Sequence, residues 1–123
     1  LPTAYIIVGY GGAAGHVGRA RPVPYEKPEI ALAYSLAAYM LGMNYIYLEA
    51  GSGAPRPVPP ELVRMVKSAL PNAVLIVGGG IRTPEVAVEL AKAGADVVVT
   101  GNIVEDDLGR ALEIVRAVKR VRK

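Results

Sequence analysis

The sequence predicts an α/β fold in which four parallel strands are each followed by a helix. A short run of β-branched and aromatic residues, a glycine-rich turn and a helical stretch with apolar residues three to four positions apart recur four times along the chain. The runs are apolar on both faces, as in strands of a parallel sheet that helices cover. Strands that run in one direction need a crossover between them, and the helical stretches supply it.

The first unit begins with a strand over 5–8 and continues into a glycine-rich loop over 9–18. After a connection rich in proline, a helix is expected over 29–41, ending at Gly42 in a left-handed C-cap. Residues 9–12 have the look of a dinucleotide-binding fingerprint, but the sequence predicts no helix starting there, so we do not assign that role. His16, the one histidine, is expected to be a surface residue of this loop.

The second unit has a strand over 45–49, a small-residue loop over 50–54 and a helix over 60–70 with proline in its first turn. In the third, a strand over 74–77 and a turn over 78–82 lead to a helix. Thr83 is expected to cap that helix, with Pro84 at its first position and Gly94 at its end.

The fourth unit is expected to have a strand over 96–100, then Gly101 and Asn102, and a closing helix over 106–121. Asp106 and Asp107 are expected to cap this helix, because carboxylates at a helix N-terminus accept free backbone N–H groups.

Two architectures satisfy this alternation of strands and helices, an open doubly wound sheet and a (β/α)8 barrel. A barrel typically needs about 250 residues, so four β/α units in 123 residues make about half of one. Half a barrel has unpaired edges on its outer strands and exposes the face that would fill the interior. We therefore expect it to associate with its missing half or with a second copy, as a homo-oligomer.

Composition limits the class of protein further. A hydrophobic share of 52% and a net charge of +3 predict a folded chain rather than a disordered one. There is no cysteine, which excludes disulfides, thiolate metal sites and cysteine nucleophiles. Because residue 1 is Leu rather than Met, we expect residues 1–123 to be a single domain within a longer parent chain.

No stretch approaches the roughly 20 apolar residues of a membrane-spanning helix, and no signal-like segment opens the chain. We therefore expect a cytoplasmic protein, with peripheral contact to a membrane surface left open. A solvated helix end explains the basic residues near the C-terminus, so no nucleic acid partner is expected. These residues are Arg116, Lys119, Arg120, Arg122 and Lys123.

The glycine turns after the third and fourth strands carry the main functional signal. In barrels, the loops after strands seven and eight often bind phosphate through backbone N–H groups. The turn over 78–80 and the pair Gly101 and Asn102 fall at those loops if these strands are the last four of a barrel. The alternative is that glycine only permits a positive φ there. No Gly-Lys-Ser/Thr sequence follows, so the turns are not a P-loop.

Glu49 ends a strand that is otherwise apolar, and a carboxylate at the C-terminal end of a barrel strand points into the mouth of the site. Burying it without a partner is costly, so it is a candidate acceptor for substrate hydroxyls, general base or metal ligand. The alternative is a structural ion pair with Arg56 or Arg82. Tyr47 lies two residues earlier on the same face and offers a hydroxyl, with core packing as its alternative role.

Three ordered motifs resemble the C-terminal half of the geranylgeranylglyceryl phosphate synthase family, archaeal (β/α)8 enzymes of membrane-lipid synthesis. They are YLEAGSGA at 47–54, VGGGIRTPE at 77–85 and the segment 93–102, and residues 20–31 also resemble the family. The resemblance covers essentially the whole chain. It implies a prenyltransferase that joins the 3-hydroxyl of sn-glycerol 1-phosphate to geranylgeranyl diphosphate, releasing pyrophosphate with the help of Mg²⁺.

The same resemblance implies which residues contact glycerol phosphate. Glu49 and Tyr47 would lie at the glycerol hydroxyls, with Glu49 orienting or deprotonating the attacking one, and the glycine turns would hold the phosphate. The full set is Tyr47, Leu48, Glu49, Ala50, Gly51, Ser52, Gly53, Gly78, Gly79, Gly80, Gly101 and Asn102. Tyr34 and Tyr39 are candidates to line a groove for the prenyl tail, although core packing explains them too.

Two departures from the family limit what the resemblance implies. The family's magnesium-binding acid lies near the end of its first strand and has no counterpart here, so the Mg²⁺ ligands are expected in the missing N-terminal half and none in this chain. Arg19 stands where the family often has an acidic residue. Two other functions stay open, a non-catalytic phosphate-binding half-barrel and another phosphate-binding barrel enzyme.

Overall fold

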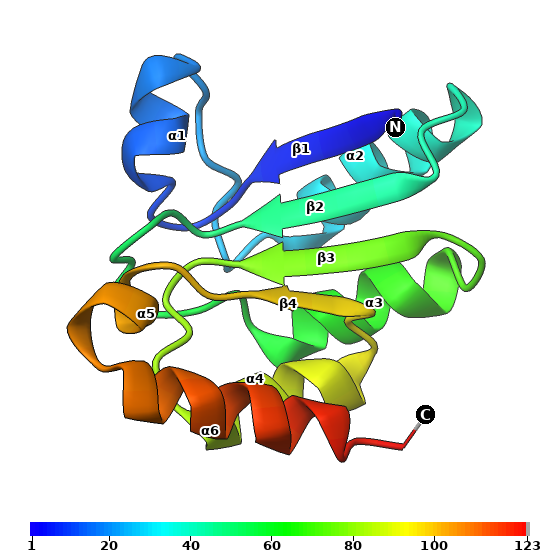
Figure 1. Ribbon diagram of the computed structural model, residues 1–123. Helices are drawn as coiled ribbons and strands as arrows, with labels where there is room; N and C mark the ends of the chain where they lie inside the picture. Colours follow the sequence, from blue (N-terminus) through cyan, green and yellow to red (C-terminus); the bar gives the residue numbers. More distant parts are fainter. Residues whose placement is uncertain (123) are drawn as a thin grey trace.

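The computed structural model describes residues 1–122, so Lys123 of the basic C-terminal run lies outside the described residues. Its four strands form one parallel sheet in the order β1-β2-β3-β4 (Figure 1). This order follows the chain, as in half of a (β/α)8 barrel, and lacks the reversal of a doubly wound sheet. The strands are β1 (Thr3–Ile7), β2 (Tyr45–Glu49), β3 (Val74–Gly78) and β4 (Val97–Val99).

Six helices accompany the strands within residues 1–122. Figure 1 shows α2, α3 and α4 behind the sheet, and α6 packs against α4. None of the helices in this part of the chain has the length and apolar character that crossing a membrane requires. The helices are α1 (Gly12–Val17), α2 (Pro28–Met40), α3 (Pro60–Ala69), α4 (Pro84–Ala93), α5 (Asn102–Asp106) and α6 (Leu108–Lys119).

The two faces of the sheet differ in burial. The face toward the helices forms the core, with Ala4, Ile6, Ile46, Leu48, Leu75 and Val77 all buried. The other face carries two rows set by the strand register, Tyr5-Tyr47-Ile76-Val97 and Ile7-Glu49-Gly78-Val99. Tyr5 is 50% exposed and Val97 43%. This second face is the one that fills the interior when a barrel is closed.

The predicted caps of α2 and α4 are confirmed. Gly42 follows α2 with φ +90°, and the N–H groups of Gly42 and Met43 reach back to the carbonyls of Tyr39 and Ala38, which is the Schellman pattern. The Thr83 hydroxyl accepts a hydrogen bond from the Val86 N–H at 3.3 Å, and Gly94 ends α4.

The closing helix expected over 106–121 is confirmed as α6 with shorter ends, but the sequence did not predict the short α5 before it. Asp107 has extended backbone and separates α5 from α6. Its side chain accepts the Arg110 N–H at 3.0 Å, so Asp107 caps α6 as expected. Asp106 instead ends α5 and caps nothing. The short α5 directly after β4 resembles the extra helix that accompanies phosphate sites in barrels.

The expectation that no helix begins in the 9–18 loop is also wrong, because α1 starts at Gly12. Gly11 and Gly12 both have positive φ, and a Cβ on Gly12 would lie 2.9 Å from the Gly51 Cα. The start of α1 therefore contacts the loop after β2. The glycine-rich sequence of this segment does not predict the helix. His16 lies on α1 and is exposed, as expected.

Smaller differences lie at the strand ends. The first strand covers Thr3–Ile7 rather than 5–8, and Val8 follows it as an isolated bridge with Val23. The fourth strand is Val97–Val99, shorter than the expected 96–100.

At the N-terminal ends of the strands, Lys67 of α3 contacts the residue before β3 and the residue before β4. Its ammonium group donates to the Asp96 carboxylate at 2.8 Å and to the Ala73 carbonyl at 2.8 Å. The same Asp96 oxygen accepts the Leu75 N–H at 2.8 Å. Both side chains are about a quarter exposed, 24% and 28%, so solvent weakens this ion pair only in part.

We predict that Lys67→Met lowers the free energy of unfolding by about 1–2 kcal/mol, because it removes the two hydrogen bonds that the ammonium group donates and keeps the aliphatic stem. Urea unfolding followed by circular dichroism measures the change. Lys92→Met, at an exposed position of α4, is the matched control and should shift stability by less than about 0.5 kcal/mol. Equal effects of the two substitutions would contradict a role for Lys67 in joining these elements.

Candidate functional site

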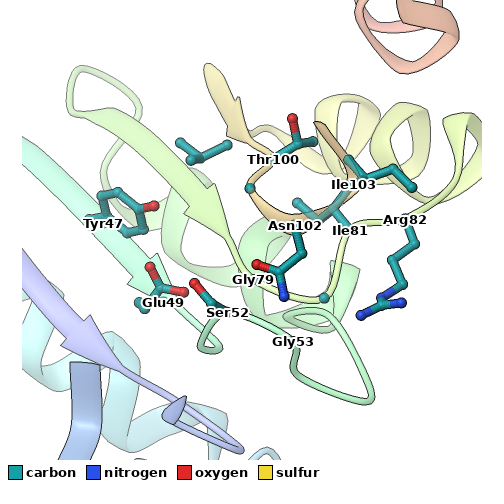
Figure 2. A pocket seen from close by; sticks show the side chains of 13 residues that line it. Tyr47, Glu49, Ser52, Gly53, Gly79, Ile81, Arg82, Thr100, Asn102 and Ile103 are labelled. Carbon is teal, nitrogen blue, oxygen red and sulfur yellow. The ribbon is translucent and has the colours of Figure 1, made fainter. Parts of the chain in front are cut away.

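The C-terminal ends of β2, β3 and β4 surround a cavity of about 90 Å³. This is much more than the roughly 10–15 Å³ that one water needs and less than the roughly 300–1,000 Å³ of most drug-sized ligand sites. Figure 2 shows Tyr47 and Glu49 on one side and Asn102 and Arg82 toward the other. The cavity therefore suits a small polar ligand.

Most of the residues that the sequence singled out line this cavity, and five others join them. Tyr47, Glu49, Ser52, Gly53, Gly79, Gly80, Gly101 and Asn102 belong to the predicted set. Sequence reasoning did not include Ile81, Arg82, Val99, Thr100 and Ile103. Arg82 is the cationic side chain among the lining residues, and its place directly after a glycine turn was a signal that could have found it.

Four residues of the predicted set do not line the cavity. Leu48 and Ala50 are fully buried in the hydrophobic core. A Cβ on Gly78 would lie 2.5 Å from the Tyr47 hydroxyl. Gly51 is buried, and its N–H donates to Glu49.

Glu49 is 7% exposed, and both of its carboxylate oxygens have donors. Oε2 accepts the Tyr5 hydroxyl at 2.6 Å, and Oε1 accepts the Gly51 N–H at 2.7 Å. The alternative of an ion pair with Arg56 or Arg82 is wrong for residues 1–122, where Glu49 makes no ion pair. Arg56 instead lies over the ring of Tyr25, 5.3 Å from its centroid.

Tyr5 and Tyr47 stand side by side on the open face of the sheet, with ring centroids 4.7 Å apart. Burial, and then the negative charge of Glu49, raise the pKa of Tyr47 to about 12. Burial, and then the hydrogen bond to Glu49, raise the pKa of Tyr5 above its usual range. Both hydroxyls keep their protons at neutral pH and can donate hydrogen bonds.

Glycine at positions 51 and 79 has a steric cause. Gly79 has φ +92°, and a Cβ there would lie 2.6 Å from the Gly51 nitrogen and 2.9 Å from Glu49 Oε1. Gly51 has φ +100°, and its Cβ would lie 2.5 Å from the Gly12 nitrogen. The loops after β1, β2 and β3 thus touch through their backbones, which explains these glycines in part without a ligand.

Gly101 differs from the other two. Its φ of −121° lies outside the left-handed region, and a Cβ would meet nothing within 4 Å. Crowding therefore does not require glycine here. Because Gly101 lines the cavity, the missing side chain leaves the backbone open to a ligand.

Residues 1–122 offer no fitting site for a resident metal ion. No group of three or more His, Cys, Asp or Glu side chains in this range is arranged to hold one. Glu49, the acid at the cavity, already accepts two hydrogen bonds. We therefore derive no chemical step through a metal held by these residues.

Comparison with known proteins found one matching family and several similar proteins. The PcrB family matches residues 1–119. Geranylgeranylglyceryl phosphate synthases from Metallosphaera sedula and Saccharolobus solfataricus are 61% and 56% identical to the chain over 98% and 97% of its length. The chain spans about half the length of these curated relatives, 48% and 46%.

A crystal structure of (S)-3-O-geranylgeranylglyceryl phosphate synthase from Thermoplasma acidophilum, in complex with its substrate sn-glycerol-1-phosphate, is similar in fold. It is 44% identical in sequence and has a TM-score of 0.93. The match covers 98% of this chain and 50% of that one. The fold expected from the sequence, four parallel strands with helices as in half of such a barrel, is confirmed.

We predict that Gly79→Ala destabilises the chain by about 2 kcal/mol more than Gly42→Ala. Both residues have positive φ, +92° and +90°, so the strain of an L-residue is shared. Only at Gly79 would the new methyl group collide with backbone, whereas nothing lies within 4 Å at Gly42. Urea unfolding of the two variants measures the difference, and equal losses would contradict the close contact between the loops.

We predict that Tyr5 and Tyr47 ionise at a higher pH than an ordinary tyrosine, and that Glu49→Gln lowers the pKa of both. A nearby negative charge disfavours tyrosinate, so neutralising that charge makes ionisation easier. Absorbance at 295 nm against pH follows the titration. Because the pKa is raised in the folded state, the folded chain should lose stability as pH rises from about 10 toward 12. A titration unchanged by Glu49→Gln would contradict the contact.

Proposed function

The chain belongs to the PcrB family, and on that premise we propose that it supplies the glycerol phosphate half of a prenyltransferase site. The proposed reaction transfers a geranylgeranyl group from its diphosphate to the 3-hydroxyl of sn-glycerol 1-phosphate. One observation carries the proposal: a buried carboxylate without an ion-pair partner faces, across a small cavity, the glycine turns that follow two neighbouring strands.

The phosphate group of the ligand would lie at the turns after β3 and β4. Gly79, Gly80, Gly101 and Asn102 line the cavity there. Glycine lets backbone N–H groups approach an anion closely, and loops at this place in a barrel commonly bind phosphate. The guanidinium of Arg82, at the same end of the cavity, adds a charge of the sign that a phosphate needs.

The hydroxyl groups of the ligand would lie at Glu49 and Tyr47. An ionised carboxylate only accepts hydrogen bonds, so it selects groups that carry a proton. As the hydroxyl oxygen bonds to the prenyl carbon and the carbon–oxygen bond to diphosphate breaks, the hydroxyl proton would pass to Glu49 as general base. Tyr47 keeps its own proton and orients the hydroxyl as a neutral partner.

We infer that the rest of the site comes from a second set of β/α units. The open face of the sheet and the free edges of β1 and β4 would be covered by the missing half of the barrel, or by a second copy of this chain in a homo-oligomer. That half would hold Mg²⁺ and the diphosphate of geranylgeranyl diphosphate. We also propose that the enzyme is cytoplasmic. The apolar prenyl tail of the substrate favours peripheral contact with a membrane surface.

The two tyrosines proposed for the prenyl groove differ in the structure. Tyr34 is 60% exposed and lines a hollow of about 310 Å³ beside β1 together with Tyr5 and Arg21. Tyr39 packs against the hydrophobic core. Only Tyr34 stays in our proposal for the groove, and Tyr39 serves packing.

We predict that the chain binds sn-glycerol 1-phosphate more tightly than inorganic phosphate, and that Glu49→Gln lowers the affinity for glycerol phosphate by about tenfold. The affinity for inorganic phosphate should change by less than about twofold, because phosphate would bind at the glycine turns and Arg82 rather than at Glu49. Isothermal titration calorimetry measures both. Glu61→Gln on the exposed side of α3 is the matched control and should change neither affinity.

A second arm tests catalysis. The chain is mixed with a separately produced N-terminal half of a relative, labelled glycerol phosphate, geranylgeranyl diphosphate and Mg²⁺. Product in the mixture supports the prenyltransferase function. Tight phosphate binding without product in any mixture would favour a non-catalytic phosphate-binding module instead.

A further inference from the structure

We propose that Tyr5 is a positioning residue that holds the Glu49 carboxylate in place for the hydroxyl groups of the ligand. This inference rests on the function proposed above. Tyr5 does not line the cavity, so it would act through Glu49 rather than by touching the ligand.

The register of the sheet brings the two residues together. Tyr5 pairs with Tyr47, and Ile7 pairs with Glu49, so Tyr5 and Glu49 lie on the same face of neighbouring strands, one row apart. The Tyr5 hydroxyl reaches diagonally to Glu49 Oε2 at 2.6 Å, the short distance of a bond to a charged acceptor. The Tyr47 ring, 4.7 Å away, supports the Tyr5 ring from the side.

Each of the two donors bonds to a different oxygen of the carboxylate. The Gly51 N–H holds Oε1 at 2.7 Å, and the Tyr5 hydroxyl holds Oε2. One donor is fixed by the backbone and the other by a rigid ring, so the carboxylate has little freedom to rotate. Losing the Tyr5 bond would remove the 2.6 Å donor from Oε2, so the carboxylate could turn more freely even though Tyr47 also interacts with it.

The kind of donor matters as much as its place. Both donors are neutral, so the negative charge of Glu49 is not cancelled by a cation as it would be beside Arg or Lys. The pKa of Tyr5 is raised by burial and by its bond to Glu49, so the hydroxyl keeps its proton and stays a donor. Each carboxylate oxygen retains a further lone pair that can accept a ligand hydroxyl.

Tyr45 provides a matched control for Tyr5. It lies on the same face of β2, two residues before Tyr47, and pairs with Thr3. Tyr45 is partly buried, like Tyr47. Its side chain takes part in none of the hydrogen bonds found in residues 1–122. Tyr45→Phe therefore removes a hydroxyl from the same surface without touching Glu49.

Calorimetry on the full chain tests the proposal with two probes, sn-glycerol 1-phosphate and inorganic phosphate. Tyr5→Phe should weaken glycerol phosphate binding about tenfold, the scale of one hydrogen bond to a charged group. The same variant should change phosphate binding by less than about twofold, since phosphate would bind at the glycine turns and Arg82 rather than at Glu49. A general loss of structure would weaken both ligands together, so the change in their ratio is specific to positioning. Tyr45→Phe should leave both affinities unchanged.

The outcomes separate the two proposals. If the wild-type chain binds both ligands equally, the proposed function is overturned. If the wild-type preference for glycerol phosphate survives Tyr5→Phe, only the positioning role is overturned.

A double-mutant cycle tests the contact without any ligand. Tyr5→Phe, Glu49→Gln and the double variant are compared by urea unfolding. Coupling that changes the unfolding equilibrium constant about fivefold or more supports the contact, since residues that share a hydrogen bond do not act independently. Additive effects would overturn the positioning role.

Discussion

The buried Glu49 carboxylate is the constraint on which the functional end of this sheet depends. A charge at 7% exposure needs hydrogen-bond donors, and no cation supplies them within residues 1–122. The Gly51 N–H donates only because the chain turns back over the end of β2. That turn needs a positive φ at Gly51 and brings its backbone against Gly12 on one side and Gly79 on the other. The hydrogen bond to the Glu49 carboxylate therefore depends on the packing of the loops after β1, β2 and β3 against one another.

The second constraint is the open face of the sheet. A parallel sheet is normally covered on both faces, yet here helices cover only one, and Tyr5, Val97 and Val99 remain exposed on the other. The chain spans about half the length of its relatives, and the match to the solved relative covers 98% of this chain and 50% of that one. We infer that the bare face is the one that a second set of strands would cover in a barrel, with the cavity at the mouth of that barrel.

The sequence predicted the repeating architecture well because the period of apolar residues and the glycine and proline positions state it directly. The second strand was predicted at its observed bounds, and Thr83, Gly94 and Gly42 mark real helix ends. The helix α1 was missed because its six residues include two glycines and show no apolar period. The helix α5 was missed because its five residues are too few to show an apolar period.

The site shows a different limit. Tyr5 could not be linked to Glu49 from the sequence, because their contact depends on the pairing of β1 with β2, which a single chain does not reveal. With the register known, the alternation of side chains along a strand predicts that Tyr5 and Glu49 lie on the same face of the sheet. Arg82 was considered only as an ion-pair partner for Glu49, and the structure places it among the lining residues instead.

The motif at 47–53 also shows why a resemblance carried over residue by residue mixes two kinds of role. Tyr47 and Glu49 face the cavity, whereas Leu48 and Ala50 pack in the core, as the two-residue period of a strand requires. Glycines divide in the same way. Gly51 and Gly79 are required by crowded backbone, while Gly101 has open space beside it. Steric necessity therefore explains the first two, and the absence of a side chain at position 101 is the stronger sign of a ligand that approaches the backbone.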